Sequence, residues 1–396
     1  MPLALLALTL SAFAIGTTEF VIVGLIPTMA QDLNVSLPSA GLLVSLYALG
    51  VAIGAPVLTA LTGKWNRKHV LLTVMALFVA GNVLAWQAPG YETLIAARII
   101  TGLAHGVFFS IGSTIATGLV PKEKAASAIA IMFTGLTVAL VTGVPLGTYI
   151  GQTFGWQATF LTVALLGLIA LIGSSLLVPN NLQQPAATKI SAQLKVLTQP
   201  RLLLVYAITA LGYGGTFVAF TFLAPILEQV SGFESHAIGL IMLVYGVSVA
   251  IGNIWGGKMA DKLGPIKALS IIFIGLAAIL VVFNFTAVNP IAAVITILVW
   301  GAFAFGNVPG LQVYVVKLAQ VHTPNAVDVA SGLNIAAFNV GIALGAWGGG
   351  IIVEQAGLMH TPWVGAVIVL LALALTRYSG SLDNKTNSTA VSRATA

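Results

Sequence analysis

The sequence has no cysteine and very few charged residues. Of its 396 residues, only 7% are Asp, Glu, Lys or Arg, whereas 58% are hydrophobic. The lack of cysteine excludes disulfides, thiolate nucleophiles and cysteine-ligated metals. Soluble domains carry about 25% charged residues, so no soluble fold of this length would hide so many apolar side chains. HExxH and GxSxG patterns are also absent, and five scattered histidines do not form a metal site. We therefore expect a membrane protein that is not an enzyme and binds no cofactor.

Long apolar stretches fill most of the chain. A membrane-spanning helix needs about 20 mostly apolar residues, and breaks rich in Pro, Gly and charge separate twelve such stretches. The predicted spans are 4–28, 39–62, 69–88, 93–119, 126–150, 157–178, 202–227, 236–257, 266–287, 290–316, 327–352 and 362–378. The first is too long for the apolar part of a signal peptide. The polar tail 380–396 is expected to be disordered.

Basic residues occur in alternate breaks only. Apart from Arg98, the Lys and Arg residues follow the even-numbered spans: Lys64, Arg67, Lys68, Lys122, Lys124, Lys189, Lys195, Arg201, Lys258, Lys262, Lys267, Lys317, Arg377, Lys385 and Arg393. In the other breaks, every charged residue is acidic. The positive-inside rule then predicts that both termini are cytoplasmic. Since the net charge of +6 comes from these loops, it indicates no nucleic-acid partner.

The two halves of the sequence are related by a shift of 198 residues. The matches include Pro27 with Pro225, Lys64 with Lys262, and the glycine-rich stretch 143–147 with 341–345. Because the shift spans six helices, both halves enter the membrane in the same direction. We predict two parallel six-helix bundles, 1–180 and 201–379, joined by a cytoplasmic linker at 181–200. In such proteins the substrate site lies between the repeats, near the middle of the bilayer.

Four motifs give the sequence a family resemblance. They are Gly16–Thr17–Thr18–Glu19–Phe20, Arg98–Ile99–Ile100–Thr101–Gly102, Gly143–Val144–Pro145–Leu146–Gly147 continued to Gly151, and Gly257–Lys258–Met259–Ala260–Asp261–Lys262–Leu263–Gly264. Together they resemble the major facilitator superfamily, and within it the twelve-helix drug:proton antiporters, which include sugar, purine and chloramphenicol efflux proteins. The resemblance covers nearly the whole chain except the tail.

The resemblance implies an all-α major facilitator fold in the bacterial cytoplasmic (inner) membrane, with the proton gradient as the energy source. The 143–151 motif implies export rather than uptake. Conformational roles are implied for Gly143, Pro145, Gly147, Gly151, Gly257, Asp261, Lys262 and Gly264. The first-half copy of the loop motif lacks the acid expected at position 63, so a latch built on that acid is not expected there.

Three residues inside the spans are candidates for proton coupling. Glu19 lies roughly 15 Å from the outer end of its span at 1.5 Å per residue. A carboxylate in hydrocarbon either binds and releases protons or serves as a protonated structural group. Arg98 lies roughly 8 Å deep and either snorkels to the outer surface or acts on the carboxylate, as the resemblance implies. His105 is closer in depth to Glu19 than Arg98 is. Glu19 is therefore expected to contact one of these two residues, either Arg98 or His105. A lone membrane histidine also often serves as an interhelical hydrogen bonder.

In the second half, no Asp, Glu, Lys, Arg or His lies well inside a predicted span, and Asp328 lies at the cytoplasmic edge of 327–352. Neutral polar and aromatic side chains are the candidates for substrate binding there, and Phe109, on the same helix face as His105, joins them. They are Phe109, Tyr213, Phe217, Trp300, Asn307, Gln312, Asn334, Phe338 and Asn339. Helix packing is the alternative role for each aromatic residue. Such a lining suits an uncharged or weakly polar molecule, either a sugar or a drug-like compound.

The leading prediction is a monomeric proton-coupled antiporter that exports a small organic molecule by alternating access. Its partners would be that substrate, protons and the lipid bilayer. The alternative is a proton symporter or facilitator that takes up a small nutrient.

Overall fold

The computed structural model describes residues 2–62, 65–121, 124–180 and 196–394, and helices make up nearly all of these ranges. Twelve helical spans are long and apolar enough to cross a membrane, which confirms the predicted number. Six of these spans extend at least four residues beyond a predicted end, because a helix continues into polar flanks at little cost once its apolar part has formed. Lys64, Lys122, Lys189 and Lys195, like most of the predicted linker, lie outside the described residues.

In the first half, the helices are α1 (Leu3–Asp32), α2 (Leu37–Ile53), α3 (Thr59–Leu61), α4 (Arg67–Trp86), α5 (Tyr91–Gly118), α6 (Ala125–Val138), α7 (Val144–Phe154) and α8 (Trp156–Leu177). In the second half they are α10 (Pro200–Phe220), α11 (Leu223–Gln229), α12 (Ser235–Leu263), α13 (Pro265–Thr286), α14 (Pro290–His322), α15 (Val327–Ala356) and α16 (Thr361–Ala394). Gly155 and Gly264, with φ of 89° and 79°, reverse the chain between consecutive helices.

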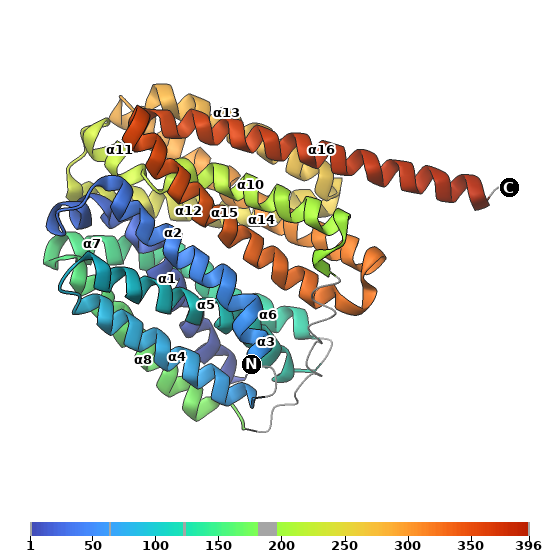
Figure 1. The fold of residues 1–396 in the computed structure, drawn as a ribbon, viewed down its shortest axis with the longest axis horizontal. Coiled ribbons are helices and arrows are strands. Elements are labelled where there is room, and N and C mark those ends of the chain that lie inside the picture. Colours follow the sequence, from blue (N-terminus) through green and yellow to red (C-terminus); the bar gives the residue numbers. More distant parts are fainter. Residues whose placement is uncertain (1, 63–64, 122–123, 181–195, 395–396) are drawn as a thin grey trace.

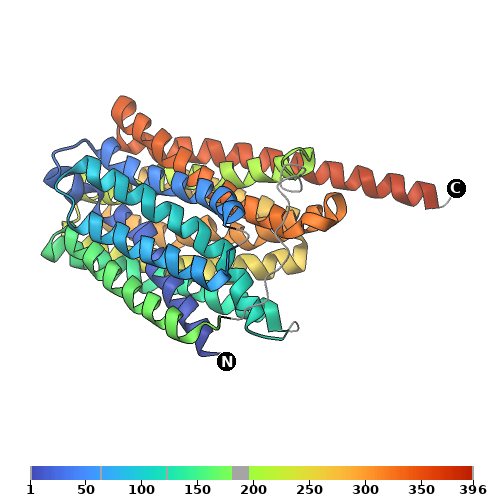
Figure 2. The same cartoon turned by 60° about the horizontal axis from the view of Figure 1, so that its bottom comes forward.

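The two halves form two layers of helices that run roughly parallel to one long axis (Figure 1; Figure 2). The first half, coloured blue to green, occupies the lower part of Figure 1, and the second half, yellow to red, lies above it. The side chains of Asp32, Glu234 and Glu354 lie near one end of this axis, which we name the acidic end. The opposite end, where α4 begins and α12 finishes, is the basic end.

Glycines spaced four apart bring the helices of each half together. A Cβ on Gly147 would lie 2.8 Å from Val21 of α1, and one on Gly151 would lie 2.7 Å from Leu25. In the second half, a Cβ on Gly341 would lie 2.5 Å from the Ala210 carbonyl oxygen of α10. The motif 143–151 and its repeat 341–349 therefore each pack against the first helix of their own half. The first-half glycines meet side chains of α1, whereas the second-half glycines meet the backbone of α10, where small residues allow the helices to approach closely.

Gly345→Ala is expected to destabilise the protein, because its new methyl group would meet the backbone carbonyl of Gly214. Such overpacking typically costs about 1–3 kcal/mol. Gly348→Ala on the same helix is the matched control, since a Cβ there has no described atom within 4 Å. The control is expected to be neutral or to gain up to about 1 kcal/mol from helix propensity. Thermal unfolding in detergent measures both, and equal melting temperatures would contradict the packing.

Two spans of the first half contain a π-helical turn beside a proline. One turn covers Gly54–Leu58, which includes Pro56, and the other covers Ala139–Gly143, two residues before Pro145. Proline lacks an N–H and its ring collides with the carbonyl four residues earlier, so the helix relaxes into a wider turn. The second turn places the Leu140 carbonyl directly against Gly246 of α12. It therefore shapes a contact between the halves.

The halves meet closely at the acidic end. The Ser45 hydroxyl of α2 donates a hydrogen bond of 2.7 Å to the carbonyl oxygen of Ala343 in α15. Nearer the end, a Cβ on Gly350 would lie 3.4 Å from the Cβ of Pro38. On the other side, a Cβ on Gly239 of α12 would lie 3.3 Å from the Pro145 carbonyl oxygen. Contacts on both sides of the interface thus close the acidic end.

The C-terminal helix is the longest of the described helices. It runs from Thr361 to Ala394 and projects beyond the bundle (Figure 1). Extending a helix that is already nucleated adds one hydrogen bond for each residue fixed, so polar residues suffice there. Asp383, at the start of this extension, pairs with Arg201 and also accepts a hydrogen bond of 3.0 Å from the Tyr314 hydroxyl.

Candidate functional site

Glu19 lies in the middle of α1, where the two halves meet. Its side chain is buried, and it faces a small void between the halves. The void is lined by Glu19, Phe20, Val44, Tyr47, Ala48, Phe217 and Ile342, which come from α1, α2, α10 and α15. This space is too small for a substrate, so the centre of the molecule is closed here. The carboxylate is thus at the point where any relative movement of the halves changes its surroundings.

Glu19 and His105 approach each other in the interior of the first half. Glu19 Oε2 lies 3.9 Å from His105 Nδ1, and both side chains are less than a tenth exposed. That distance is too long for a hydrogen bond. His105 Nδ1 instead shares a hydrogen bond of 3.0 Å with the hydroxyl of Tyr47. Of the two contacts left open by the sequence, Glu19 therefore makes the one with His105.

Arg98 is held inside the first half by α1 and α2. Its Nη1 donates to the Thr18 carbonyl oxygen at 2.9 Å, and its Nε donates to the Leu43 carbonyl oxygen at 3.4 Å. The guanidinium carbon lies 4.0 Å from the centre of the Tyr47 ring, a cation–π contact. Only 1% of the residue is exposed, so it does not snorkel to the outer surface. These interior partners are within reach because α5 packs against α2 and also contacts α1.

Tyr47 connects the three candidate coupling residues, although sequence reasoning missed it. Its ring covers the Arg98 guanidinium, its hydroxyl binds His105, and it lines the void beside Glu19. Arg98 and Glu19 have no direct ion pair among the described residues. The only available signal was a tyrosine within a mostly apolar span, and that signal is weak. Because α2 also carries Ser45, Tyr47 belongs to the helix that closes the acidic end.

Tyr47→Phe is expected to lower stability by about 1 kcal/mol, because it removes one neutral hydrogen bond and leaves His105 Nδ1 without this partner. Tyr47→Leu also removes the cation–π contact, which is worth roughly 2 kcal/mol when buried, and is expected to be clearly worse. Thermal unfolding in detergent gives the melting temperatures of the wild type and the two variants, and so their order of stability. Tyr378→Phe, at an exposed tyrosine, is the control. If both Tyr47 variants melt with the wild type, the assigned contacts are wrong.

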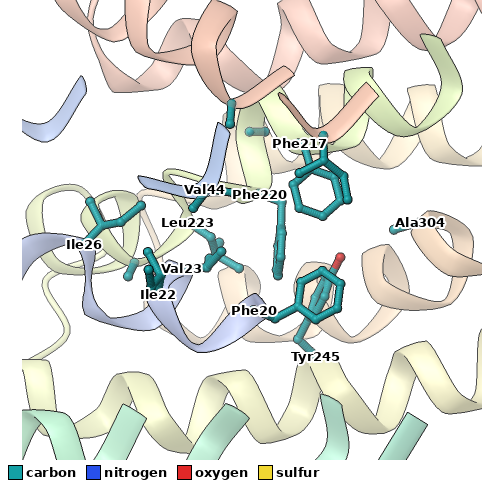
Figure 3. Packing of buried hydrophobic residues seen from close by; sticks show 14 of the residues in the cluster. Phe20, Ile22, Val23, Ile26, Val44, Phe217, Phe220, Leu223, Tyr245 and Ala304 are labelled. Atoms are coloured by element: carbon teal, nitrogen blue, oxygen red, sulfur yellow. The ribbon is translucent and has the colours of Figure 1, made fainter. Parts of the chain in front are cut away.

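The aromatic candidates of the second half gather in one cluster. Tyr213 contacts Phe217 at 5.3 Å and Phe338 at 4.9 Å between ring centres. The cluster also contains rings that the sequence did not single out: Phe20, Phe220, Tyr245 and Phe305. Trp300 joins through Tyr245, at 6.0 Å. Figure 3 shows Phe20, Phe217, Phe220 and Tyr245 directed toward one another at this interface.

The amide candidates form a separate group. Asn334 donates to Gln312 Oε1 at 2.9 Å and accepts from the Thr209 hydroxyl at 2.7 Å, so α10, α14 and α15 are joined. Asn307 and Asn339 donate only to carbonyls of their own helices, and their side-chain oxygens have no partner among the described residues.

The remaining candidates lie away from this centre. The centre of the Phe109 ring lies 5.0 Å from that of His105. The Phe109 ring also contacts the rings of Phe108 and Phe133, and all four residues belong to the first half. Gly257, Asp261, Lys262 and Gly264 lie along the last turns of α12 at the basic end, where Asp261 and Lys262 are exposed.

Comparison with known proteins agrees with this architecture. Residues 8–327 match the family model of the Major Facilitator Superfamily. The chain is 54% identical to the uncharacterized MFS-type transporter YtbD of Bacillus subtilis (strain 168) over 382 residues, 96% of each protein. It is 32% identical to a chloramphenicol resistance protein of Streptomyces lividans over 386 residues, covering 94% of this chain and 95% of that protein.

The fold is similar to that of a bacterial homologue of the human lysosomal transporter Spinster, crystallised in an inward-facing and unoccupied conformation. The TM-score is 0.76 at 18% identity, and the match covers 95% of this chain and 96% of that chain. The family predicted from the four motifs is confirmed. The chain is a multi-pass membrane protein and belongs to the Major Facilitator Superfamily.

Proposed function

We propose that this transporter is a proton-coupled antiporter that exports a small, uncharged organic molecule, with Glu19 as the group that carries the proton. One observation supports this most strongly: among the described residues, Glu19 is the only buried Asp or Glu. A membrane carboxylate that makes no direct ion pair with an arginine or lysine is costly to keep charged. Such a group is retained more readily if it exchanges protons as part of the working cycle.

The surroundings of Glu19 link its protonation to the movement of the halves. In the closed void a neutral, protonated Glu19 is the less costly form, because no water reaches it. When the halves separate, water enters and the carboxylate can ionise. His105 and Tyr47 beside it supply exchangeable protons, and Arg98 provides a positive charge behind the Tyr47 ring. Loading and release of the proton would therefore accompany closure and opening.

Export rather than uptake is supported by two features. The 143–151 stretch that resembles the antiporter motif packs against α1, the helix that carries Glu19. The relative from Streptomyces lividans is named a chloramphenicol resistance protein. The basic loops orient the basic end toward the cytoplasm by the positive-inside rule, so the closed acidic end would face outward. In that orientation a proton entering from outside would drive substrate outward.

The direction is tested in cells that lack or overproduce the protein. They are given a panel of labelled sugars, nucleosides and antibiotics, with and without an uncoupler that collapses the proton gradient. We expect overproduction to lower the accumulation of at least one compound, and the uncoupler to abolish the difference. Raised accumulation on overproduction would favour the uptake alternative instead.

A further inference from the structure

Five aromatic rings at the interface of the halves form a closed circle. In order, the distances between ring centres are 6.2 Å from Phe20 to Phe217, 5.4 Å to Phe220, 4.5 Å to Tyr245, 6.4 Å to Phe305 and 6.1 Å back to Phe20. All lie in the range of favourable aromatic pairs. Phe220 and Tyr245 are stacked at 19°, whereas Phe305 meets both Phe20 and Tyr245 edge-on.

Four of these rings belong to the second half, and Phe20 is the one from the first half. Phe217 and Phe220 come from α10, Tyr245 from α12 and Phe305 from α14. The Phe20 side chain extends from α1 to the second half (Figure 3), where its ring contacts Phe217 and Phe305. We name the four second-half rings the aromatic box. Phe20 crosses the boundary between the halves and occupies the place in the circle between Phe217 and Phe305.

We infer that the aromatic box binds a flat aromatic ring of the transported molecule, and that Phe20 occupies the box when no ligand is bound. This inference rests on the proposed transport function and names its substrate class. A ring that takes the place of Phe20 between Phe217 and Phe305 would gain the same tilted and edge-on contacts that Phe20 now makes. It could enter only after Phe20 withdraws with α1.

Two polar atoms beside the box indicate a second feature of the ligand. The Tyr245 hydroxyl and the Trp300 indole N–H have no partner among the described residues, although both side chains are at least 98% buried. Buried donors normally have a partner. A hydrogen-bond acceptor on the ligand would satisfy them, so the class is a neutral aromatic molecule that carries an oxygen acceptor.

The same surroundings disfavour a sugar at this position. A sugar would bring many hydroxyls into a box whose four side chains offer a single hydroxyl group. Each hydroxyl left without a partner in an apolar site costs free energy. The box is also formed by uncharged side chains, which favours a neutral ligand.

The position of Phe20 connects ligand binding to coupling. Phe20 directly follows Glu19 in α1, and both residues line the same void. Withdrawal of the Phe20 ring would therefore shift the backbone that carries the carboxylate. Ligand and proton would compete through the movement of one helix segment.

The test is binding of 1-naphthol to the purified full-length protein in lipid nanodiscs, measured by equilibrium dialysis with excess unlabelled ligand as the correction. Decahydro-1-naphthol is the matched ligand, since it keeps the hydroxyl but lacks the aromatic ring. We expect 1-naphthol to bind saturably and about tenfold tighter than its saturated counterpart, as expected for aromatic contacts. Equal affinity for the two ligands would overturn the inference.

Variants of Phe20 separate occupancy from misfolding. Phe20→Ala is expected to tighten 1-naphthol binding, because the box is then vacant, and Phe20→Trp is expected to weaken it. Phe305→Ala should abolish binding, whereas Phe108→Ala, which removes a buried ring outside the box, should leave it unchanged. If Phe20→Ala binds no better than the wild type, the inference fails. Because no proton gradient is present, this outcome is independent of whether the protein couples transport to protons.

Discussion

A Glu19→Gln protein will still bind its substrate but will not move it against a concentration gradient. The amide has nearly the shape of a protonated carboxyl group, so it fits the void beside Tyr47 and Phe217. It cannot release a proton, and the step that requires the charged form is lost. In proteoliposomes with an imposed pH gradient, uphill transport by this variant should fall to the level of protein-free liposomes. Downhill exchange of labelled for unlabelled substrate should continue.

Glu354→Gln is the matched control for that experiment. Glu354 is exposed and lies near the acidic end of α15. Its replacement by Gln therefore makes the same chemical change at a position away from the void. It should transport as the wild type does. If Glu19→Gln pumps uphill with unchanged pH dependence, Glu19 is not the coupling group, and His105 becomes the next candidate to be replaced.

A disulfide between positions 38 and 350 should stop transport by locking the acidic end. The Cβ of Pro38 and a Cβ built on Gly350 are 3.4 Å apart, close to the separation of about 3.8 Å that disulfides prefer. The chain contains no cysteine, so a Pro38→Cys, Gly350→Cys protein has no competing thiols. Oxidation should cross-link α2 to α15, abolish transport, and be fully reversed by a reductant.

Each single-cysteine protein is the control for the lock. Oxidant should leave the transport rate of Pro38→Cys alone and of Gly350→Cys alone unchanged. Formation of the cross-link is followed by mass spectrometry of the peptides that contain the two positions. A protein that is fully cross-linked and still transports at the uncross-linked rate would show that the acidic end does not open during the cycle.

Most of the fold could be predicted from hydrophobicity and charge. Twelve apolar runs have about the length that a membrane-spanning helix needs, and each run can satisfy its backbone only as a helix. The repeat relating 143–151 to 341–349 also predicts similar packing, which both halves show. The length of α16 could not be predicted in this way, because the polar residues at its end carry no hydrophobic signal.

The candidate site was only partly predictable. Glu19, Arg98 and His105 stand out as polar groups in apolar spans. Their partner Tyr47 does not, since its role depends on how α2 is rotated against α5. The aromatic box combines rings from α10, α12 and α14, and its occupant Phe20 comes from the opposite half. Contacts among helices that are far apart in sequence depend on tertiary packing, and a single sequence without related sequences holds no direct record of them.

The most direct test of the account is whether substrate and protons cross the membrane in opposite directions, in exchange for each other. Proteoliposomes containing a pH-sensitive dye are loaded with a compound that the cell assay identifies, and are then diluted into buffer without it. For an antiporter, outward movement of the compound should draw protons inward, so the lumen acidifies, and Glu19→Gln should show no such change. An alkaline shift of the lumen, or acidification that persists in Glu19→Gln, would contradict the account.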